Sequence, residues 1–131
     1  MIDDEHELRD LETIIGQKAL DGNYTYVLVM YDSSKELKGS NLADVQSAAM
    51  AVQNLLLVAC TLGIGVKLIG GLGDVEVLRR AVDAPHGIRP VILLAIGYAA
   101  EWPDPPQRRP LSDMLHYGKF AGKLQPNSRD P

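Results

Sequence analysis

The sequence is poor in the residues that build disulfides, metal centres and nucleic-acid surfaces. It holds one cysteine, Cys60, and three histidines, His6, His86 and His116. A lone cysteine excludes an internal disulfide, and histidines this far apart form no metal-ligand motif. Lysine and arginine form no run, and the net charge is -4. We therefore expect neither a bound metal nor a nucleic-acid partner, since a nucleic acid requires several phosphates to be neutralised.

Catalytic motifs and targeting signals are also missing. The chain has no Gly-x-Ser-x-Gly elbow and no P-loop, and Gly63-Ile64-Gly65 follows a predicted helix instead of opening one after a strand. Hydrolase, P-loop and Rossmann functions therefore lose support. The acidic first ten residues lack the basic region and apolar core of a signal peptide, so we expect a reducing cytoplasm. No side chain is predicted to be catalytic.

The length of 131 residues and the hydrophobic content of 46% suit a single domain. Apolar spacings of three and four predict an amphipathic helix from about Asp4 to Leu20, which stops at the turn around Gly22. Continuous apolar runs over 24–31 and 90–98 predict two central strands covered on both faces. A short strand is expected over 66–69. Asp74 is expected to cap a helix that runs to about residue 82 and has Val75, Leu78 and Val82 on its inner face.

The longest predicted helix covers residues 42–62 and has Ser40 or Asn41 as its cap. It is apolar almost all round, so we expect it to be buried almost all round, with Cys60 as a small buried thiol. Its unbroken apolar stretches fall well below the roughly 18 residues of a membrane span. One small domain has difficulty surrounding such a helix. We therefore expect a second subunit to pack across it.

The chain changes character after Ala99. Four prolines between residues 103 and 110 predict an extended path, and apolar residues follow on a segment too short to form its own core. We expect an arm over 99–120 that packs on a neighbouring subunit, and disorder over 125–131.

Two features are candidates for ligand binding. Gly70 and Gly71 follow a strand and precede a helix, so their backbone is able to approach a flat ligand closely; the alternative is a plain turn. Arg108 and Arg109 form a basic pair that is able to hold a phosphate; the alternative is a solvated pair.

Six blocks of sequence, in order and in register, resemble a known family. The helix 49–59 (AMAVQNLLLVA) leads to LGIG at 62–65 and IGG at 69–71. APHGIRPV follows at 84–91, IGYA at 96–99, and RRPL with MLHY between 108 and 117. This order resembles the nitroreductase family of FMN-dependent oxidoreductases from about Tyr24 to Phe120.

The resemblance implies an α+β fold, a three-layer sandwich with a central mixed sheet flanked by helices. It implies a homodimer interlocked through helix 42–62 and the C-terminal arm, with FMN at the interface. In that family the flavin takes hydride from NAD(P)H and reduces a nitroarene or a quinone. The cofactor-binding positions it implies are Lys67, Leu68, Ile69, Gly70, Gly71, Arg108 and Arg109.

Two departures from the family pattern leave two functions open. The family's opening Arg-Arg-Ser-x-Arg-x-Phe motif does not occur in this chain, and Lys67 and Leu68 stand where many members have Cys and Trp. One hypothesis is an FMN-dependent oxidoreductase, in which a second chain completes the flavin site or Lys67 supplies a positive charge near the ring. The other is a cofactor-free structural or accessory subunit.

Overall fold

The computed structural model describes residues 5–16, 24–35 and 42–116, and the side chains of its first helix from Arg9 onward. The chain divides into two compact units, with the boundary in the sequence between Ala100 and Glu101, and each is described by itself. The first unit holds all the longer elements: α1 (Glu5–Ile15), β1 (Thr25–Asp32), α2 (Ala43–Thr61), β2 (Gly65–Ile69), α3 (Val75–Ala81) and β3 (Ile88–Gly97).

The described strands form one sheet in the order β1-β3-β2. Both neighbours pair antiparallel with β3, so the mixed sheet that we expected is wrong for these strands. The prediction of a central strand is confirmed for β3. For β1 it is wrong, because β1 lies at an edge of the described sheet; its continuous apolar run reflects cover on both faces, not a strand neighbour on each side.

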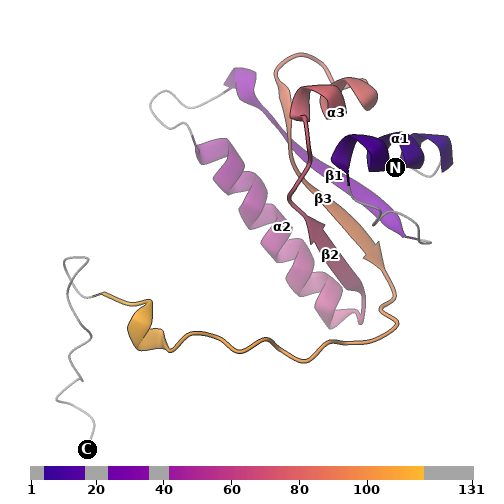
Figure 1. Ribbon diagram of the computed structural model, residues 1–131. Coiled ribbons are helices and arrows are strands. Elements are labelled where there is room, and N and C mark those ends of the chain that lie inside the picture. Colours follow the sequence, from indigo (N-terminus) through magenta and orange to yellow (C-terminus); the bar gives the residue numbers. More distant parts are fainter. Residues whose placement is uncertain (1–4, 17–23, 36–41, 117–131) are drawn as a thin grey trace, which may run out of the picture. The chain divides into compact units, whose positions relative to one another are not determined.

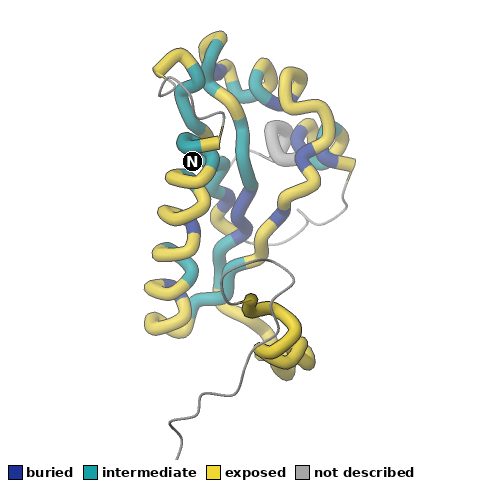
Figure 2. Tube along the Cα trace, turned by 90° about the vertical axis from the view of Figure 1, so that its left-hand side faces the viewer, coloured by how far each residue is buried: buried dark blue, intermediate teal, exposed yellow. Residues whose placement is uncertain are grey.

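Helices cover both faces of the sheet, which gives the three layers that the resemblance implied (Figure 1). Figure 2 shows the layers edge on, with α2 on one side of the strands and α1 with α3 on the other. The α1 and α3 side holds the main core, whose buried members come from both helices, all three strands and the loop after β2. They are Leu11, Ile15, Tyr26, Ile69, Leu72, Leu78, Leu93 and Ala95.

The first helix is shorter than predicted. It ends at Ile15, and Gly16 follows with φ +68, a conformation that glycine adopts without steric cost. The N–H of Gly16 still donates to the carbonyl of Glu12 at 2.8 Å. The turn around Gly22, where we had placed the stop, lies outside the described residues.

The third helix begins as predicted, at Asp74. Its Oδ1 accepts hydrogen bonds from the backbone N–H of Glu76 at 2.9 Å and of Val77 at 3.1 Å. Leu78 is fully buried, whereas Val75 is exposed, so the predicted inner face is wrong at Val75. Val82, which follows the last residue of α3, is partly buried and packs against the core, as predicted.

In this single chain the second helix is exposed on its outer side, the side on which the prediction places a second subunit. Among the residues of α2, only Val52 and Ala59 are buried. Met50 and Leu57 are 67% and 58% exposed. Cys60 is exposed as well, so its predicted burial is wrong for the isolated chain. Within the described residues, the sheet packs on one side of α2, through β1 and β2.

The two ends of α2 differ in how they are formed. Its first cap position is Leu42, which makes no side-chain cap bond; the predicted caps Ser40 and Asn41 lie outside the described residues. Gly63 ends the helix with φ +71, as expected. By length and composition alone, α2 is the one helix in the described part of the chain that is apolar enough to cross a membrane, which is weak evidence for a span.

The second unit is described over residues 101–116. It has a single short 3-10 turn, Leu111–Asp113, and all its described residues are exposed. The stretch 101–110 has neither helix nor strand. The segment 125–131, predicted to be disordered, lies outside the described residues.

Candidate functional site

The candidate glycine pair lies where β2 leaves the sheet. The last pair of the β2–β3 ladder is Ile69 with Leu93, so the peptide groups of Gly70 and Gly71 lie beyond it. Both glycines are exposed, and β2 lies at an edge of the described sheet. Their backbone therefore lies at the surface, on a segment that the sheet holds in place.

Gly70 has open space where a side chain would point. A Cβ built on it meets nothing within 4 Å, and its φ lies outside the left-handed region. The packing of this chain therefore accepts alanine at residue 70. Because residue 70 has no side chain, a ligand is able to approach its backbone closely.

Unlike Gly70, Gly73 is required by the packing of the chain. Its φ is +65, and a Cβ would collide with the carbonyl oxygen of Ile14. Leu72, between the glycines, is buried in the core cluster with Ile69. The open backbone at residues 70–71 is thus fixed on both sides, by Ile69 in β2 and by Leu72 and Gly73 against α1.

The predicted site residues fall into two groups. Lys67, Leu68, Ile69, Gly70 and Gly71 are consecutive at the end of β2, where Lys67 and Leu68 are exposed and the side chain of Ile69 is 2% exposed. Ile69 therefore offers a ligand its backbone only. Arg108 and Arg109 belong to the second unit, where both are exposed.

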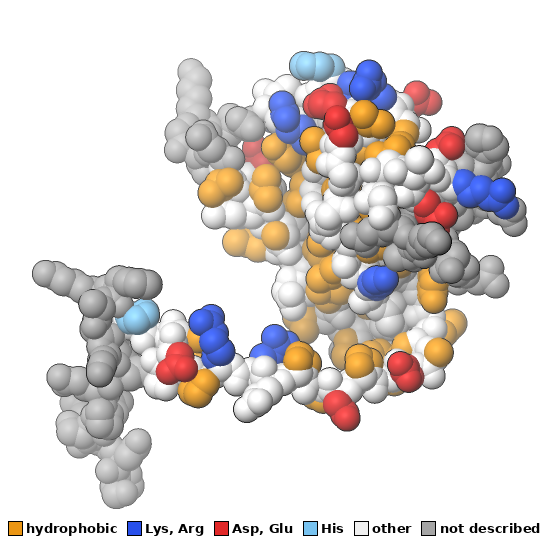
Figure 3. All heavy atoms as spheres, viewed as in Figure 1, with side chains coloured by type: hydrophobic (Ala, Val, Ile, Leu, Met, Phe, Trp, Pro, Cys, Tyr) orange, Lys and Arg blue, Asp and Glu red, His pale blue; other side chains and the backbone are white. Residues whose placement is uncertain are grey.

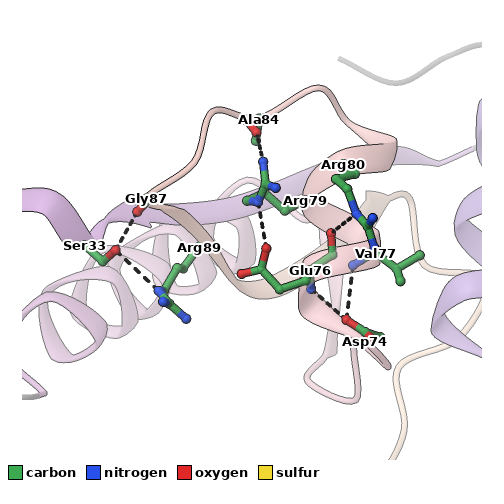
Figure 4. A network of polar contacts seen from close by, with 9 residues as sticks. All are labelled: Ser33, Asp74, Glu76, Val77, Arg79, Arg80, Ala84, Gly87 and Arg89. Atoms are coloured by element: carbon green, nitrogen blue, oxygen red, sulfur yellow. Dashed lines mark hydrogen bonds and ion pairs between the residues drawn. The ribbon is translucent and has the colours of Figure 1, made fainter.

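Polar contacts within α3 and the turn that follows it form one group in Figure 4, separate from the contacts around Ser33. Arg79 donates from Nε to a Glu76 carboxylate oxygen at 3.0 Å and from its guanidinium to the carbonyl of Ala84. The hydrogen bond from Arg79 lowers the pKa of Glu76, with smaller contributions from the charges of Arg79, Arg89 and His86. This network stabilises the turn that follows α3.

The block at 84–91 has a structural role here. Ser33 donates to the carbonyl of Gly87 from both its N–H and its hydroxyl at 2.8 Å. Arg89 Nε donates to the Ser33 hydroxyl at 3.3 Å. These bonds tie the end of β1 to the beginning of β3 and place no side chain at the glycine pair.

Charged side chains of both signs gather around α3 and the neighbouring strand ends (Figure 3). At the end of β1, hydrogen bonds from Ser34 lower the pKa of Asp32, and Lys35 lies 3.3 Å from its carboxylate. Within the described part of the chain, no three His, Cys, Asp or Glu side chains gather as a metal would need. Two ion pairs lie on this surface, Lys35 with Asp32 and Arg79 with Glu76.

Sequence reasoning identified the glycine pair but did not assign a role to Gly73. The signal was present, since Gly73 is the third glycine in the run Gly70-Gly71-Leu72-Gly73. Its contact with Ile14 joins residues far apart in the sequence, and no local pattern reveals such a contact.

The fold is a three-layer α+β scaffold with an exposed glycine segment at the end of β2, an edge strand of the described sheet. The family model that describes the nitroreductase family matches residues 4–98. The chain belongs to the nitroreductase family.

Curated relatives and solved structures agree with this assignment. The chain is similar to an NADPH-dependent oxidoreductase of Staphylococcus aureus (strain USA300), with 27% identity over 91% of this chain and 55% of that protein. The chain thus spans about half the length of the curated relatives that it matches.

Two solved structures resemble the fold. The nitroreductase NfrA1 from B. subtilis has a TM-score of 0.80 and 20% identity, covering 91% of this chain and 56% of that one. An NADPH:FMN oxidoreductase from Vibrio harveyi, complexed with NAD+, also has a TM-score of 0.80, with 18% identity over 95% of this chain and 59% of that one. At these identities the structures support the fold alone.

Proposed function

We propose that this chain acts as an FMN-dependent oxidoreductase that passes hydride from NAD(P)H to a small organic acceptor of the nitroarene or quinone type. The observation that carries the proposal is Gly70, which is exposed, open on its side-chain side and free of any packing need for glycine. The family and its NADPH-dependent relatives support the oxidoreductase part of the proposal. FMN and the acceptor class are the added proposal.

The residues at the end of β2 fit a flat cofactor. Gly70 and Gly71 leave the backbone uncovered by side chains, so that a planar ring is able to lie against it and accept hydrogen bonds from peptide N–H groups. Ile69 and Leu72 hold this backbone from beneath, because both side chains are buried. A rigid edge orients a ring better than a mobile loop would.

For the phosphate of the cofactor we propose Arg108 and Arg109. Both guanidinium groups are exposed, and the guanidinium fork matches the geometry of phosphate oxygens. When bound, FMN supplies the redox chemistry, because a flavin exchanges hydride with a nicotinamide and with an acceptor. The protein is left to bind and orient it, which accounts for a site made of backbone and binding groups.

The exposed side of α2 supports a further part of the proposal, that two copies of this chain pack through α2. Its apolar residues Met50, Leu57 and Val58 are all more than half exposed. Exposed apolar surface of this kind is typical of an interface. We also propose that the arm 99–120 packs on the partner, and a second, different chain remains an alternative partner for completing the flavin site.

Reconstitution tests the function directly. The full chain is mixed with FMN, passed over a desalting column and then treated with NADPH without oxygen; free FMN with NADPH is the control. We expect flavin absorbance to elute with the protein and NADPH to bleach it faster than it bleaches free FMN. A colourless protein after loading would favour the cofactor-free accessory subunit instead.

A further inference from the structure

The beginning of β2 packs closely on the chain that leaves β3. Gly65 is the first residue of β2 and pairs with Gly97, the last residue of β3. A Cβ built on Gly65 would lie 3.2 Å from the Cβ of Ala99 and 3.3 Å from the carbonyl oxygen of Gly97. Both distances are shorter than the optimal separation of non-bonded atoms. A side chain at residue 65 would therefore push the segment 97–99 outward.

This contact requires a glycine at residue 65, whereas the backbone conformation there does not. The φ of Gly65 lies outside the left-handed region. Gly63, two residues earlier, is the opposite case, with φ +71 and nothing within 4 Å of a Cβ. Two of the sequence blocks that resemble the family, 62–65 and 96–99, thus lie against each other through Gly65 and Ala99.

Residues 97–99, the arm root, connect the sheet to the proposed arm. Three prolines, at 103, 105 and 106, lie between the arm root and Arg108. A proline-rich segment is a semi-rigid spacer of about 3.1 Å per residue, so a tilt at one end is carried to the other. A displacement of a few tenths of an ångström at the arm root would therefore move Arg108 by about an ångström.

We propose that Gly65 is a positioning residue for the phosphate of the cofactor. By leaving room for the arm root, it sets the path on which the arm leaves the sheet, and with it the place of the Arg108 guanidinium. The inference rests on the proposed function and deepens it. A guanidinium holds a phosphate through directed N–H···O bonds, and a misplacement of about an ångström is enough to spoil such a geometry. Gly65 itself does not bind the cofactor.

The ratio of FMN affinity to riboflavin affinity isolates this effect, because riboflavin has the ring without the phosphate. In Gly65→Ala of the full chain we expect FMN binding to weaken about five-fold, less than the loss of Arg108 itself would cause. Riboflavin binding should stay at the wild-type value. Flavin fluorescence titration gives both affinities.

Two double variants test whether Gly65 acts through the arm. Ala99→Gly removes the nearer of the two obstructing atoms, so Gly65→Ala combined with Ala99→Gly should recover most of the wild-type ratio. Ala99→Gly alone is the control and should keep that ratio. In an Arg108→Ala background, Gly65→Ala should cause little further loss, because two changes that act on one interaction are not additive.

The outcomes distinguish this inference from the proposed function. If the wild type prefers FMN to riboflavin and Gly65→Ala keeps that preference, the inference is wrong and the proposed function stands. Equal weakening of both ligands would overturn it as well, because a general loss of structure lowers both affinities together. A full further loss in the Arg108→Ala background would place the effect outside Arg108 and overturn it too. If the wild type binds no FMN, the proposed function fails with it.

Discussion

Gly73 lies against the backbone carbonyl of Ile14, so closely that any side chain at residue 73 would collide with α1. This contact joins the loop after β2 to the end of the first helix. It fixes the position of Leu72, and through it the open backbone of residues 70–71. The candidate site therefore depends on a contact between two segments about sixty residues apart in the sequence.

Replacing Gly73 by alanine is expected to destabilise the fold strongly. The substitution combines an unfavourable positive φ, which costs about 1–2 kcal/mol, with the collision against Ile14. Gly16→Ala is the matched control, because Gly16 has φ +68 but nothing within 4 Å of a Cβ. Urea unfolding should show a clearly larger loss for Gly73→Ala than for Gly16→Ala. Equal losses would mean that the collision relaxes without cost.

The cap of α3 gives a second prediction. Asp74→Ala is expected to reduce the free energy of unfolding by about 1 kcal/mol, because two backbone N–H groups lose their acceptor. Asp74→Asn keeps an acceptor oxygen and should retain most of the stability. Thermal unfolding followed by circular dichroism measures both. A variant Asp74→Ala that melts like the wild type would show that water replaces the cap fully.

The proposed interface predicts a change in oligomeric state. Leu57→Glu places a charge on the exposed side of α2, where Leu57 is 58% exposed, so the fold of one chain should tolerate it. In a twofold dimer the charge enters the interface twice, and we expect dissociation to become at least about ten-fold easier. Val77→Glu, on the exposed side of α3, is the control. Sedimentation velocity that finds a wild-type monomer at micromolar concentration would contradict the interface.

The phosphate ligands are tested by removing each arginine. Arg108→Ala is expected to weaken FMN binding about ten-fold to a hundred-fold, the amount that one charged hydrogen bond supplies. Arg109→Ala is the parallel test of its neighbour. Riboflavin lacks the phosphate and should bind the wild type and Arg108→Ala alike. Unchanged FMN affinity in both variants would place the phosphate elsewhere.

Local patterns predicted those parts of the fold that depend on local chemistry. The continuous apolar run of β3 indicated a strand covered on both faces, and the acidic side chain of Asp74 marked the beginning of α3. The position of β1 at an edge was not predictable, because an apolar run indicates cover and not strand neighbours. Cys60 was placed inside for a similar reason: composition shows that a helix is apolar but not which side its own chain covers.

The sequence names the residues of the candidate site, which stay a prediction, but it does not reveal their geometry. The order of the sequence blocks located Gly70 and Gly71, and a strand before a helix suggested an exposed backbone. Only the register of β2 with β3 decides which face of the sheet Lys67 takes and which Leu68 takes. Only the contact of Gly73 with Ile14 distinguishes a glycine that packing requires from one, Gly70, that packing does not require.

The central claim, that a flat cofactor lies against residue 70, is tested most directly by Gly70→Ala. FMN affinity and melting temperature are measured on the wild type and on this variant of the full chain. We predict an unchanged melting temperature, because the added Cβ meets nothing within 4 Å, together with FMN binding weakened about ten-fold by the methyl group under the ring. Equal FMN affinity in both proteins, or no FMN binding by the wild type, would contradict the account.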